Sequence, residues 1–308
     1  MDQLTLITIL LPAALGIIMV GLGLELTLAD FKRVKERPKA VLIALFCQFV
    51  LLTLVAFGLS ELLRLPAELA VGLVLLSASP GGPVANLYSY LYKGDVALNI
   101  SLTAINALIA AVALPIIVNL ALVHFIQDDQ KIGLQFSKVI QVFSIIIVPV
   151  IIGMTLRHYK PHWAHRLNKP VKIFAIGFLI LIMVGAISQE GKKMLDYAAQ
   201  VGVATSLFCI ASLNIGYFVP RLFKIEESQA RACAFEIGIH NGTLAMTIAI
   251  TVLGSTTIAI PAAIYGIVML VFTWIFGTII SRNDSKLIAK NSENSSILDS
   301  NTVELSVK

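Results

Sequence analysis

Apolar runs of about twenty residues, separated by short polar segments, make up most of this 308-residue sequence. A helix of that length spans the hydrocarbon core of a bilayer and satisfies its own backbone hydrogen bonds there. Only 13% of the residues are charged, against about a quarter in an ordinary soluble domain. The sequence therefore predicts an all-α polytopic membrane protein surrounded by the lipid bilayer. The net charge of +5 does not indicate nucleic-acid binding.

Nine of these runs are long enough to span a membrane, and they form one predicted transmembrane domain over residues 1–282. The spans occupy about 4–27, 40–61, 68–91, 96–124, 137–156, 172–189, 197–219, 228–252 and 258–281. No basic segment precedes the first run, so we interpret it as a retained span rather than a signal peptide. Residues 283–308 are rich in Asn and Ser and are typical of a disordered cytoplasmic tail.

Basic residues are distributed unevenly over the loops that these nine spans define. With the N-terminus outside, 18 of the 23 Lys and Arg residues fall on the cytoplasmic side, Arg231 among them. The outer side keeps five: Arg64, Lys131, Lys138, Lys192 and Lys193. The positive-inside rule then predicts an outside N-terminus and a cytoplasmic C-terminus. We expect a multi-pass protein of the cell membrane, which in a bacterium is the inner membrane.

Two of the predicted spans contain helix-breaking residues. The third reads Ser-Pro-Gly-Gly-Pro-Val-Ala-Asn over residues 79–86, and the eighth reads Glu-Ile-Gly-Ile-His-Asn-Gly over residues 236–242. These spans are five apart, so they cross the membrane in opposite directions, and a long regular span follows each. The pattern predicts an inverted repeat of spans one to four and six to nine. Discontinuous helices at matching positions indicate the binding site of a secondary transporter.

Glu236 is the strongest candidate for a functional side chain, because no other charged residue follows it until Arg282. An ionisable group inside a membrane span is costly and is most often functional, although a carboxylate can also serve as a structural contact between helices. His240 follows at i+4 and would share a face with Glu236 if the helix were continuous. It can equally be a neutral histidine packed between helices.

The residues at the two breaks also predict half-helices that begin near the middle of the membrane. Asn241 suits the N-cap of the second half-helix in the eighth span. Pro83 suits the first turn of the half-helix that follows Gly81 and Gly82. Free backbone N–H groups and the positive ends of two helix dipoles would favour an anionic substrate.

Uncharged polar residues in the spans offer oxygen atoms, which are the ligands that a hard cation such as sodium prefers. The candidates are Gln48, Asn86, Asn99 and Thr103. Each of these alone is more often a contact between helices, and we interpret Asn106, Gln200 and Asn214 in that way. By linear counting, Asn99 lies closer to the cytoplasmic rim than Gln48 does.

Enzyme motifs are a poor match, so we do not expect an enzyme or an organic cofactor. The order Glu-x-x-x-His at residues 236–240 differs from the His-Glu-x-x-His of zinc proteases, and no Gly-x-Ser-x-Gly motif or phosphate loop occurs in a fitting context. The spacing of Cys47, Cys209 and Cys233 fits no metal site, and we interpret them as free thiols in packed helices.

Four ordered motifs resemble the bile acid:sodium symporter family, and the likeness extends over about residues 15–281. They lie at residues 23–31, at 80–86, at 93–103 with Lys-Gly-Asp-Val-Ala-Leu-Asn, and at 236–241 with Glu-Ile-Gly-Ile-His-Asn. The resemblance implies a core domain of spans two to four and seven to nine. It implies a panel domain of spans one, five and six.

The resemblance also implies two sodium sites behind the crossing of the discontinuous helices. One ion would be bound by Asn86, Asn99, Thr103 and Glu236. The other would be bound by Gln48, Glu236, His240 and the backbone carbonyls of residues 237 and 239. Substrate would lie beside the half-helix N-termini, near Pro83, Val84, Asn241 and Gly242.

The resemblance thus predicts sodium-coupled symport of an organic anion, such as a bile acid or a small carboxylate, by alternating access. The family has glutamine where this chain has His240. This departure leaves open an alternative, a proton-coupled or mixed sodium/proton symporter that uses Glu236 and His240. The sequence predicts neither the substrate nor an oligomeric state.

Overall fold

The computed structural model describes residues 3–126 and 136–281, and within these ranges all regular structure is helical. The helices are α1 (Gln3–Glu25), α2 (Leu28–Arg33), η1 (Val34–Glu36), α3 (Pro38–Phe46), η2 (Cys47–Leu51), α4 (Leu52–Leu62), α5 (Ala67–Ser77), α6 (Pro83–Leu91), α7 (Val96–Phe125), α8 (Phe136–Tyr159), α9 (Pro161–Leu222), α10 (Glu227–Gly238) and α11 (Gly242–Thr251). A final helix occupies Ile260–Ser281. The all-α prediction is confirmed for this part of the chain, and the predicted tail at 283–308 lies outside it.

Five helical stretches among the described residues are long and apolar enough to cross a membrane: Pro38–Leu62, Val96–Phe125, Ala199–Leu222, Glu227–Thr251 and Ile260–Ser281. Shorter apolar helices lie at Gly16–Glu25, Ala67–Ser77 and Ile147–Tyr159. A multi-pass helical membrane protein is therefore confirmed, whereas the count of nine spans stays a prediction.

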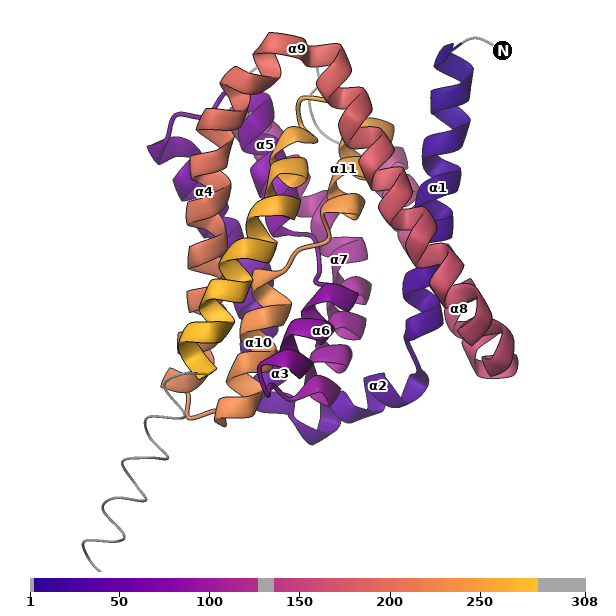
Figure 1. Cartoon of the computed structure of the whole chain (residues 1–308), viewed down its shortest axis with the longest axis vertical. Helices are drawn as coiled ribbons and strands as arrows, with labels where there is room; N and C mark the ends of the chain where they lie inside the picture. Colours follow the sequence, from indigo (N-terminus) through magenta and orange to yellow (C-terminus); the bar gives the residue numbers. More distant parts are fainter. Residues whose placement is uncertain (1–2, 127–135, 282–308) are drawn as a thin grey trace, which may run out of the picture.

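Residues 161–222 differ from the expected pattern of two spans joined by a loop. They form one helix, α9, of 62 residues that covers the predicted spans at 172–189 and 197–219 and the segment between them. In Figure 1, α9 rises from α8, bends over at its apex and descends on the other side of the molecule. The connecting residues are charged but contain no proline, and Lys, Leu and Met are good helix formers, so the segment remains helical.

A group made of α1, α8 and the rising part of α9 lies along one side of the molecule in Figure 1. Glycines let α1 and α8 touch backbone to backbone. A Cβ atom at Gly23 would collide with the carbonyl oxygen of Val150, and one at Gly153 would collide with that of Val20. Such close contacts between small residues are typical of helix packing in membranes. Whether this group moves as the predicted panel domain stays a prediction.

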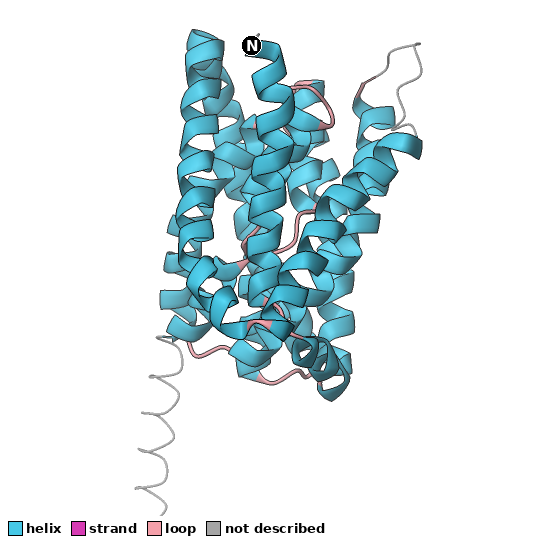
Figure 2. Ribbon diagram, turned by 90° about the vertical axis from the view of Figure 1, so that its right-hand side faces the viewer, coloured by secondary structure: helices cyan, strands magenta, loops and turns pink. Residues whose placement is uncertain are grey.

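Both predicted helix breaks are present, and they meet in the middle of the bundle. In Figure 2, loop segments lie within the bundle as well as at its ends. Figure 1 shows α5 above α6 and α10 below α11, so the two discontinuous helices run in opposite directions, as an inverted repeat requires. The backbone N–H of Asn241 donates to the carbonyl oxygen of Pro80 at 2.9 Å, which joins the two breaks directly.

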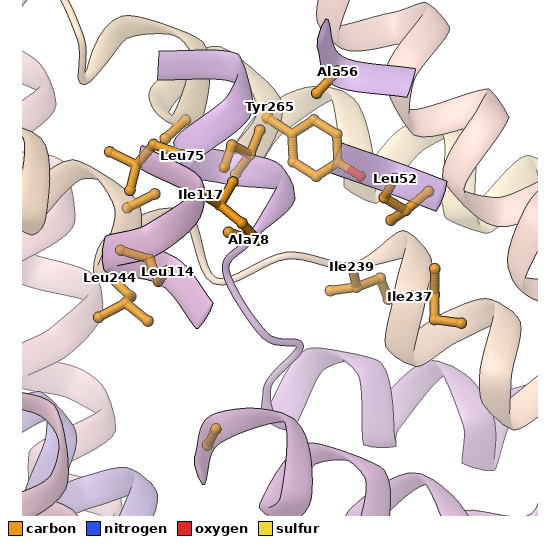
Figure 3. Packing of buried hydrophobic residues seen from close by; sticks show 14 of the residues in the cluster. Leu52, Ala56, Leu75, Ala78, Leu114, Ile117, Ile237, Ile239, Leu244 and Tyr265 are labelled. Carbon is orange, nitrogen blue, oxygen red and sulfur yellow. The ribbon is translucent and has the colours of Figure 1, made fainter. Parts of the chain in front are cut away.

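Apolar side chains pack around this crossing and fix the two extended segments against each other. Figure 3 shows Ile239 on the segment between α10 and α11, and Ala78 on the segment that leaves α5. Both residues are buried, as are Ile237 and Leu244 on either side of the second break. The crossing is therefore part of the core, and polar atoms placed there are shielded from solvent.

The orientation of the bundle in the membrane can be tested at two exposed turn residues. Arg64 follows α4 and Lys224 follows α9, and the positive-inside rule places them outside and inside, respectively. We expect a membrane-impermeant maleimide added to spheroplasts to label Arg64→Cys and not Lys224→Cys, which should be labelled only in inverted vesicles. The native cysteines are buried and would first be replaced: Cys47, Cys209 and Cys233. The reverse pattern would contradict the predicted topology.

Candidate functional site

The carboxylate of Glu236 lies at the helix crossing and is fully buried. The hydroxyl of Thr103 donates to its Oε2 at 2.6 Å, and the Asn106 amide donates to its Oε1 at 3.1 Å. The backbone N–H of Gly81 makes a further hydrogen bond to the same side chain. Three elements thus meet at one acidic group: α7, α10 and the segment between α5 and α6.

Gly81 faces the carboxylate so closely that no larger residue fits. A Cβ atom at this position would lie 2.6 Å from Cδ and from Oε2 of Glu236. Such a distance is shorter than any normal van der Waals contact. The hydrogen bonds from Thr103 and Asn106 hold the carboxylate in place, so it cannot easily move away. The glycine of the first break is therefore required for the approach of backbone to carboxylate, in addition to any role in bending the chain.

Amide oxygens without a hydrogen-bond partner are concentrated among the candidate residues. The buried Oδ1 atoms of Asn86, Asn99 and Asn106 and the buried Oε1 of Gln48 have no donor. In Asn99 the amide nitrogen is held at 2.8 Å from both Ser89 Oγ and the Ala232 carbonyl, so the orientation that leaves Oδ1 unpaired is fixed. A buried acceptor without a donor is unfavourable by about 1–3 kcal/mol.

These oxygen atoms, together with the Glu236 carboxylate, are suitable ligands for a hard cation, because such ions prefer oxygen and the carboxylate supplies a negative charge. A single carboxylate balances a single positive charge, which favours a monovalent ion. Among the described residues, no group of three or more His, Cys, Asp or Glu side chains could hold a metal ion.

Asn106, which we interpreted from the sequence as a contact between helices, makes such a contact, and its partner is the Glu236 carboxylate on α10. The sequence spacing could have linked Asn106 to Asn99 and Thr103, because positions i, i+4 and i+7 fall on one helix face. The other two residues interpreted in the same way lie elsewhere. Gln200 is exposed, and the Asn214 amide bonds to the Ile210 carbonyl of its own helix at 2.7 Å.

A second cluster of polar atoms surrounds the carbonyl oxygen of Ser79. Gln48 donates to it at 3.4 Å and to the Ser77 carbonyl at 2.9 Å, and Nδ1 of His240 lies 2.9 Å from the Ser79 oxygen. Gln48 lies in η2, a short π-helical turn, which is a common local irregularity at functional sites. The structure thus brings Gln48 and His240 together at the first helix break.

His240 lies apart from the helix that carries Glu236. The premise that both share a face at i, i+4 fails, since α10 ends at Gly238 and Ile239 is extended. The imidazole ring stacks on Phe208 and contacts Tyr265, each with ring centroids 5.3 Å apart. A carbonyl oxygen only accepts, so Nδ1 carries the proton. In the neutral form of the ring, the buried Nε2, which has no hydrogen-bond partner, then holds the lone pair.

Both predicted half-helix N-termini are confirmed. Asn241 is the N-cap of α11, with its Oδ1 accepting from the Leu244 N–H at 3.0 Å. Gly82 is the N-cap of α6, and Pro83 is its first residue. Pro83 is exposed, while Val84, Asn241 and Gly242 are partly exposed, in contrast to the buried carboxylate behind them. At Gly242 a Cβ would lie 3.0 Å from the Ala262 carbonyl, so this glycine also permits packing against the final helix.

The family of the chain follows from a comparison with family models. Residues 12–197 match the model described as the Sodium Bile acid symporter family, which is more than half of the chain. The chain belongs to this family. The resemblance inferred from the sequence motifs is thus confirmed, and members of the family are transporters rather than enzymes.

Curated relatives of the sodium bile acid symporter family match most of this chain at low identity. The probable sodium/metabolite cotransporter BASS2 of Oryza sativa is 27% identical over 83% of this chain and 60% of its own length. The uncharacterized sodium-dependent transporter YocS of Bacillus subtilis is 28% identical over 82% of this chain and 77% of its own. The hepatic sodium/bile acid cotransporter of Rattus norvegicus is 28% identical over 79% and 67%. The chain spans about 60% of the length of the plant relatives.

Proposed function

We propose that this chain is a secondary active transporter that couples the movement of sodium to the import of an organic anion. The observation that carries the proposal is the buried Glu236 carboxylate at the crossing of two discontinuous helices, among amide oxygens that have no donor. An ion bound there would neutralise the carboxylate and engage the free oxygens. The names of the relatives, which describe sodium cotransporters, support this choice of ion.

The candidate ligand atoms support two sodium sites, one made of oxygen atoms alone and one that includes a histidine nitrogen. The first would be formed by Glu236 with Asn86, Asn99 and Thr103, and we add Asn106 because it contacts the same carboxylate. The second would lie at the Ser79 break, bound by Gln48, Glu236 and His240 and by the carbonyl oxygens of residues 237 and 239. Sodium prefers oxygen to nitrogen, so a site that offers His240 Nε2 would bind it more weakly than the first.

The substrate site would lie in front of the cation sites, at the N-termini of α6 and α11. Pro83, Val84, Asn241 and Gly242 are the residues that an anion would meet there. Backbone N–H groups and the positive helix ends favour a carboxylate or a sulfonate at this place. In alternating access, the discontinuous helices would move against the group that contains α1 and α8, opening this site to each side of the membrane in turn.

Uptake into proteoliposomes under imposed gradients tests this proposal. With a radiolabelled bile acid such as cholate, we expect accumulation driven by an inward sodium gradient and little accumulation in potassium or choline. The uncharged amide of the same compound should compete poorly, because it lacks the charge that the helix ends favour. Equal competition by the amide would contradict the anion site. Accumulation driven by a proton gradient alone would contradict sodium coupling.

His240 provides a separate prediction about the number of ions that are coupled. Replacing His240 by glutamine introduces an amide oxygen where the wild-type ring offers a nitrogen. We expect His240→Gln to raise the Hill coefficient for sodium in uptake, since the second site gains a better ligand. If the wild-type protein already shows the higher coefficient, His240 is only a packing residue. Among the described residues, the His240 ring contacts the Ser79 carbonyl, Phe208 and Tyr265 rather than the Glu236 carboxylate.

A further inference from the structure

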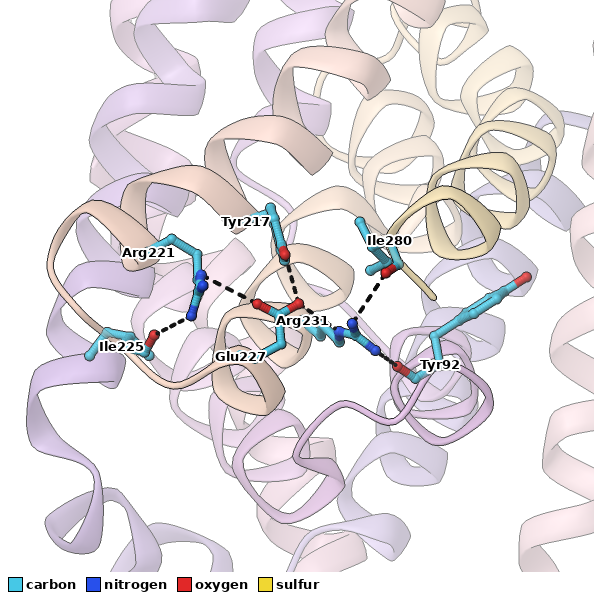
Figure 4. A network of polar contacts seen from close by, with 7 residues as sticks. All are labelled: Tyr92, Tyr217, Arg221, Ile225, Glu227, Arg231 and Ile280. Atoms are coloured by element: carbon cyan, nitrogen blue, oxygen red, sulfur yellow. Dashed lines mark hydrogen bonds and ion pairs between the residues drawn. The ribbon is translucent and has the colours of Figure 1, made fainter. Parts of the chain in front are cut away.

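Arg231 is a buried arginine that none of the assigned sites uses. We counted it among the cytoplasmic loop residues, but it lies in the second turn of α10 and its side chain is only 2% exposed. Figure 4 shows its guanidinium at the centre of a polar network. A buried guanidinium is tolerated only when its N–H donors have hydrogen-bond partners. The partners of Arg231 therefore show which elements this side chain connects.

The guanidinium joins three helix ends through three different nitrogens. Nε donates to Glu227 at 2.9 Å, Nη1 donates to the carbonyl of Tyr92 at 3.0 Å, and Nη2 donates to the carbonyl of Ile280 at 3.3 Å. Tyr92 is the C-cap of α6, and Ile280 lies in the last turn of the final helix. A cation at two helix C-termini and an acid in the first turn of α10 are both favourable for the helix dipoles.

The same acid anchors the network to α9. Glu227 accepts a hydrogen bond from the Tyr217 hydroxyl at 2.6 Å and forms an ion pair with Arg221 at 3.3 Å. Arg221 is about half exposed, and its one other hydrogen bond among the described residues is to the Ile225 carbonyl in the turn that follows α9. The network therefore contains one arginine that joins distant helices and one that makes only local contacts.

A neighbouring face of α10 contacts α7 in a constant register. The Asp95 N–H donates to the Ser228 carbonyl at 2.8 Å. One turn further, Asn99 donates to the Ala232 carbonyl, and one turn beyond that Thr103 donates to Glu236. Each pair is separated by the same number of residues, so a shift of α10 along α7 would disturb all three contacts together. Two of them orient proposed sodium ligands.

We propose that Arg231 is a positioning residue of the cation site. It holds α10 against the ends of α6 and the final helix, and thereby keeps Ala232 and Glu236 opposite their partners on α7. The guanidinium of Arg231 bonds to Glu227, Tyr92 and Ile280, and it is not proposed as a ligand of the ion. It acts through Asn99, whose amide orientation depends on the carbonyl of the residue after Arg231. The inference rests on the proposed sodium-coupled function.

Arg231→Lys tests this role, because lysine keeps the charge but cannot reach three partners in three directions. The measurement is thermal unfolding of the purified protein in a titration of sodium chloride against choline chloride. We expect the sodium concentration for half-maximal stabilisation to rise by about tenfold, which is the effect of losing about 1.4 kcal/mol of binding free energy. The matched control is Arg221→Lys, which should stay within about twofold of wild type because Arg221 contacts only α9, the following turn and Glu227.

A double mutant separates positioning from a general loss of stability. If Arg231 acts through Asn99, Arg231→Lys should add less than about a twofold effect on sodium in an Asn99→Ala background. A purely structural role would lower the unfolding temperature in choline and leave the sodium concentration for half-maximal stabilisation unchanged. If Arg231→Lys does not fold, Glu227→Gln should raise the same concentration by a smaller factor.

Three outcomes would overturn the proposal. The first is a sodium response equal to that of wild type in folded Arg231→Lys. If the lysine variant does not fold, the same result in folded Glu227→Gln counts instead. The second is full additivity with Asn99→Ala. Both would refute the positioning role while leaving the proposed function intact. The third is a wild-type protein that shows no stabilisation by sodium, which would refute the proposed function and the inference with it.

Discussion

Glu236→Gln should abolish stabilisation by sodium and sodium-driven uptake while the protein remains folded. The carboxylate is the only negative charge among the proposed ligands, and its removal leaves a cation without compensation in a medium where charges interact strongly. For the wild-type protein, sodium at 100 times its dissociation constant should stabilise the fold by about 2.7 kcal/mol. Thermal unfolding in sodium and in choline at equal ionic strength measures the difference.

The glutamine variant is suited to this comparison because its amide can still accept from Thr103 and occupies almost the same volume. Asn86→Ala, which removes an uncharged oxygen, should weaken the sodium response in the same direction. The control is Asn214→Ala, since Asn214 is polar and lies in a membrane helix but bonds only within α9. It should keep the full response. An unchanged sodium shift in Glu236→Gln would exclude this carboxylate as a sodium ligand.

Gly81→Ala should have an effect nearly as large through a different cause. The added methyl group would lie 2.6 Å from the carboxylate, so Glu236 must move and lose its contacts with Thr103 and Asn106. We expect at least a tenfold loss of sodium affinity, equivalent to about 1.4 kcal/mol. The charge is retained, so the variant tests the placement of the carboxylate rather than its presence.

Gly82→Ala is the matched control for this prediction. Gly82 is the next residue in the same break, its backbone is extended, and a Cβ there would have no atom within 4 Å. Both substitutions reduce the flexibility of the break to a similar degree, but only one places a methyl group against Glu236. Sodium affinity measured by the thermal shift should therefore fall in Gly81→Ala and stay near wild type in Gly82→Ala. Equal losses would indicate that the break needs flexibility rather than space.

The features that the sequence predicted well are local ones. Pro83 and Asn241 define the starts of α6 and α11 through their own backbone and side-chain preferences, so each helix break is specified within a few residues. The opposite directions of the two discontinuous helices follow from counting spans. The cost of a charge in the membrane made Glu236 a candidate without reference to any other helix; the structure shows it buried at the crossing, and its role as a sodium ligand stays a prediction.

The features that the sequence did not reveal depend on packing between distant segments. The carbonyl partners of Arg231 on α6 and the final helix, and the carboxylate on α10 that Asn106 contacts, cannot be read from spacing alone. Gly81 appeared to be a helix breaker, and its contact with Glu236 emerges only when α10 lies against the first break. In α9, charged residues suggested a loop, but charges are compatible with a solvent-exposed helix and do not end one.

The close contact between Gly23 on α1 and Gly153 on α8 affects how the protein is made. About 130 residues separate the two glycines, and ribosomes add about 5–20 residues per second. The first helix must therefore wait for roughly 6–26 seconds in the membrane before its partner is synthesised. During that interval the small-residue face of α1 lacks the α8 backbone against which it packs in the folded protein.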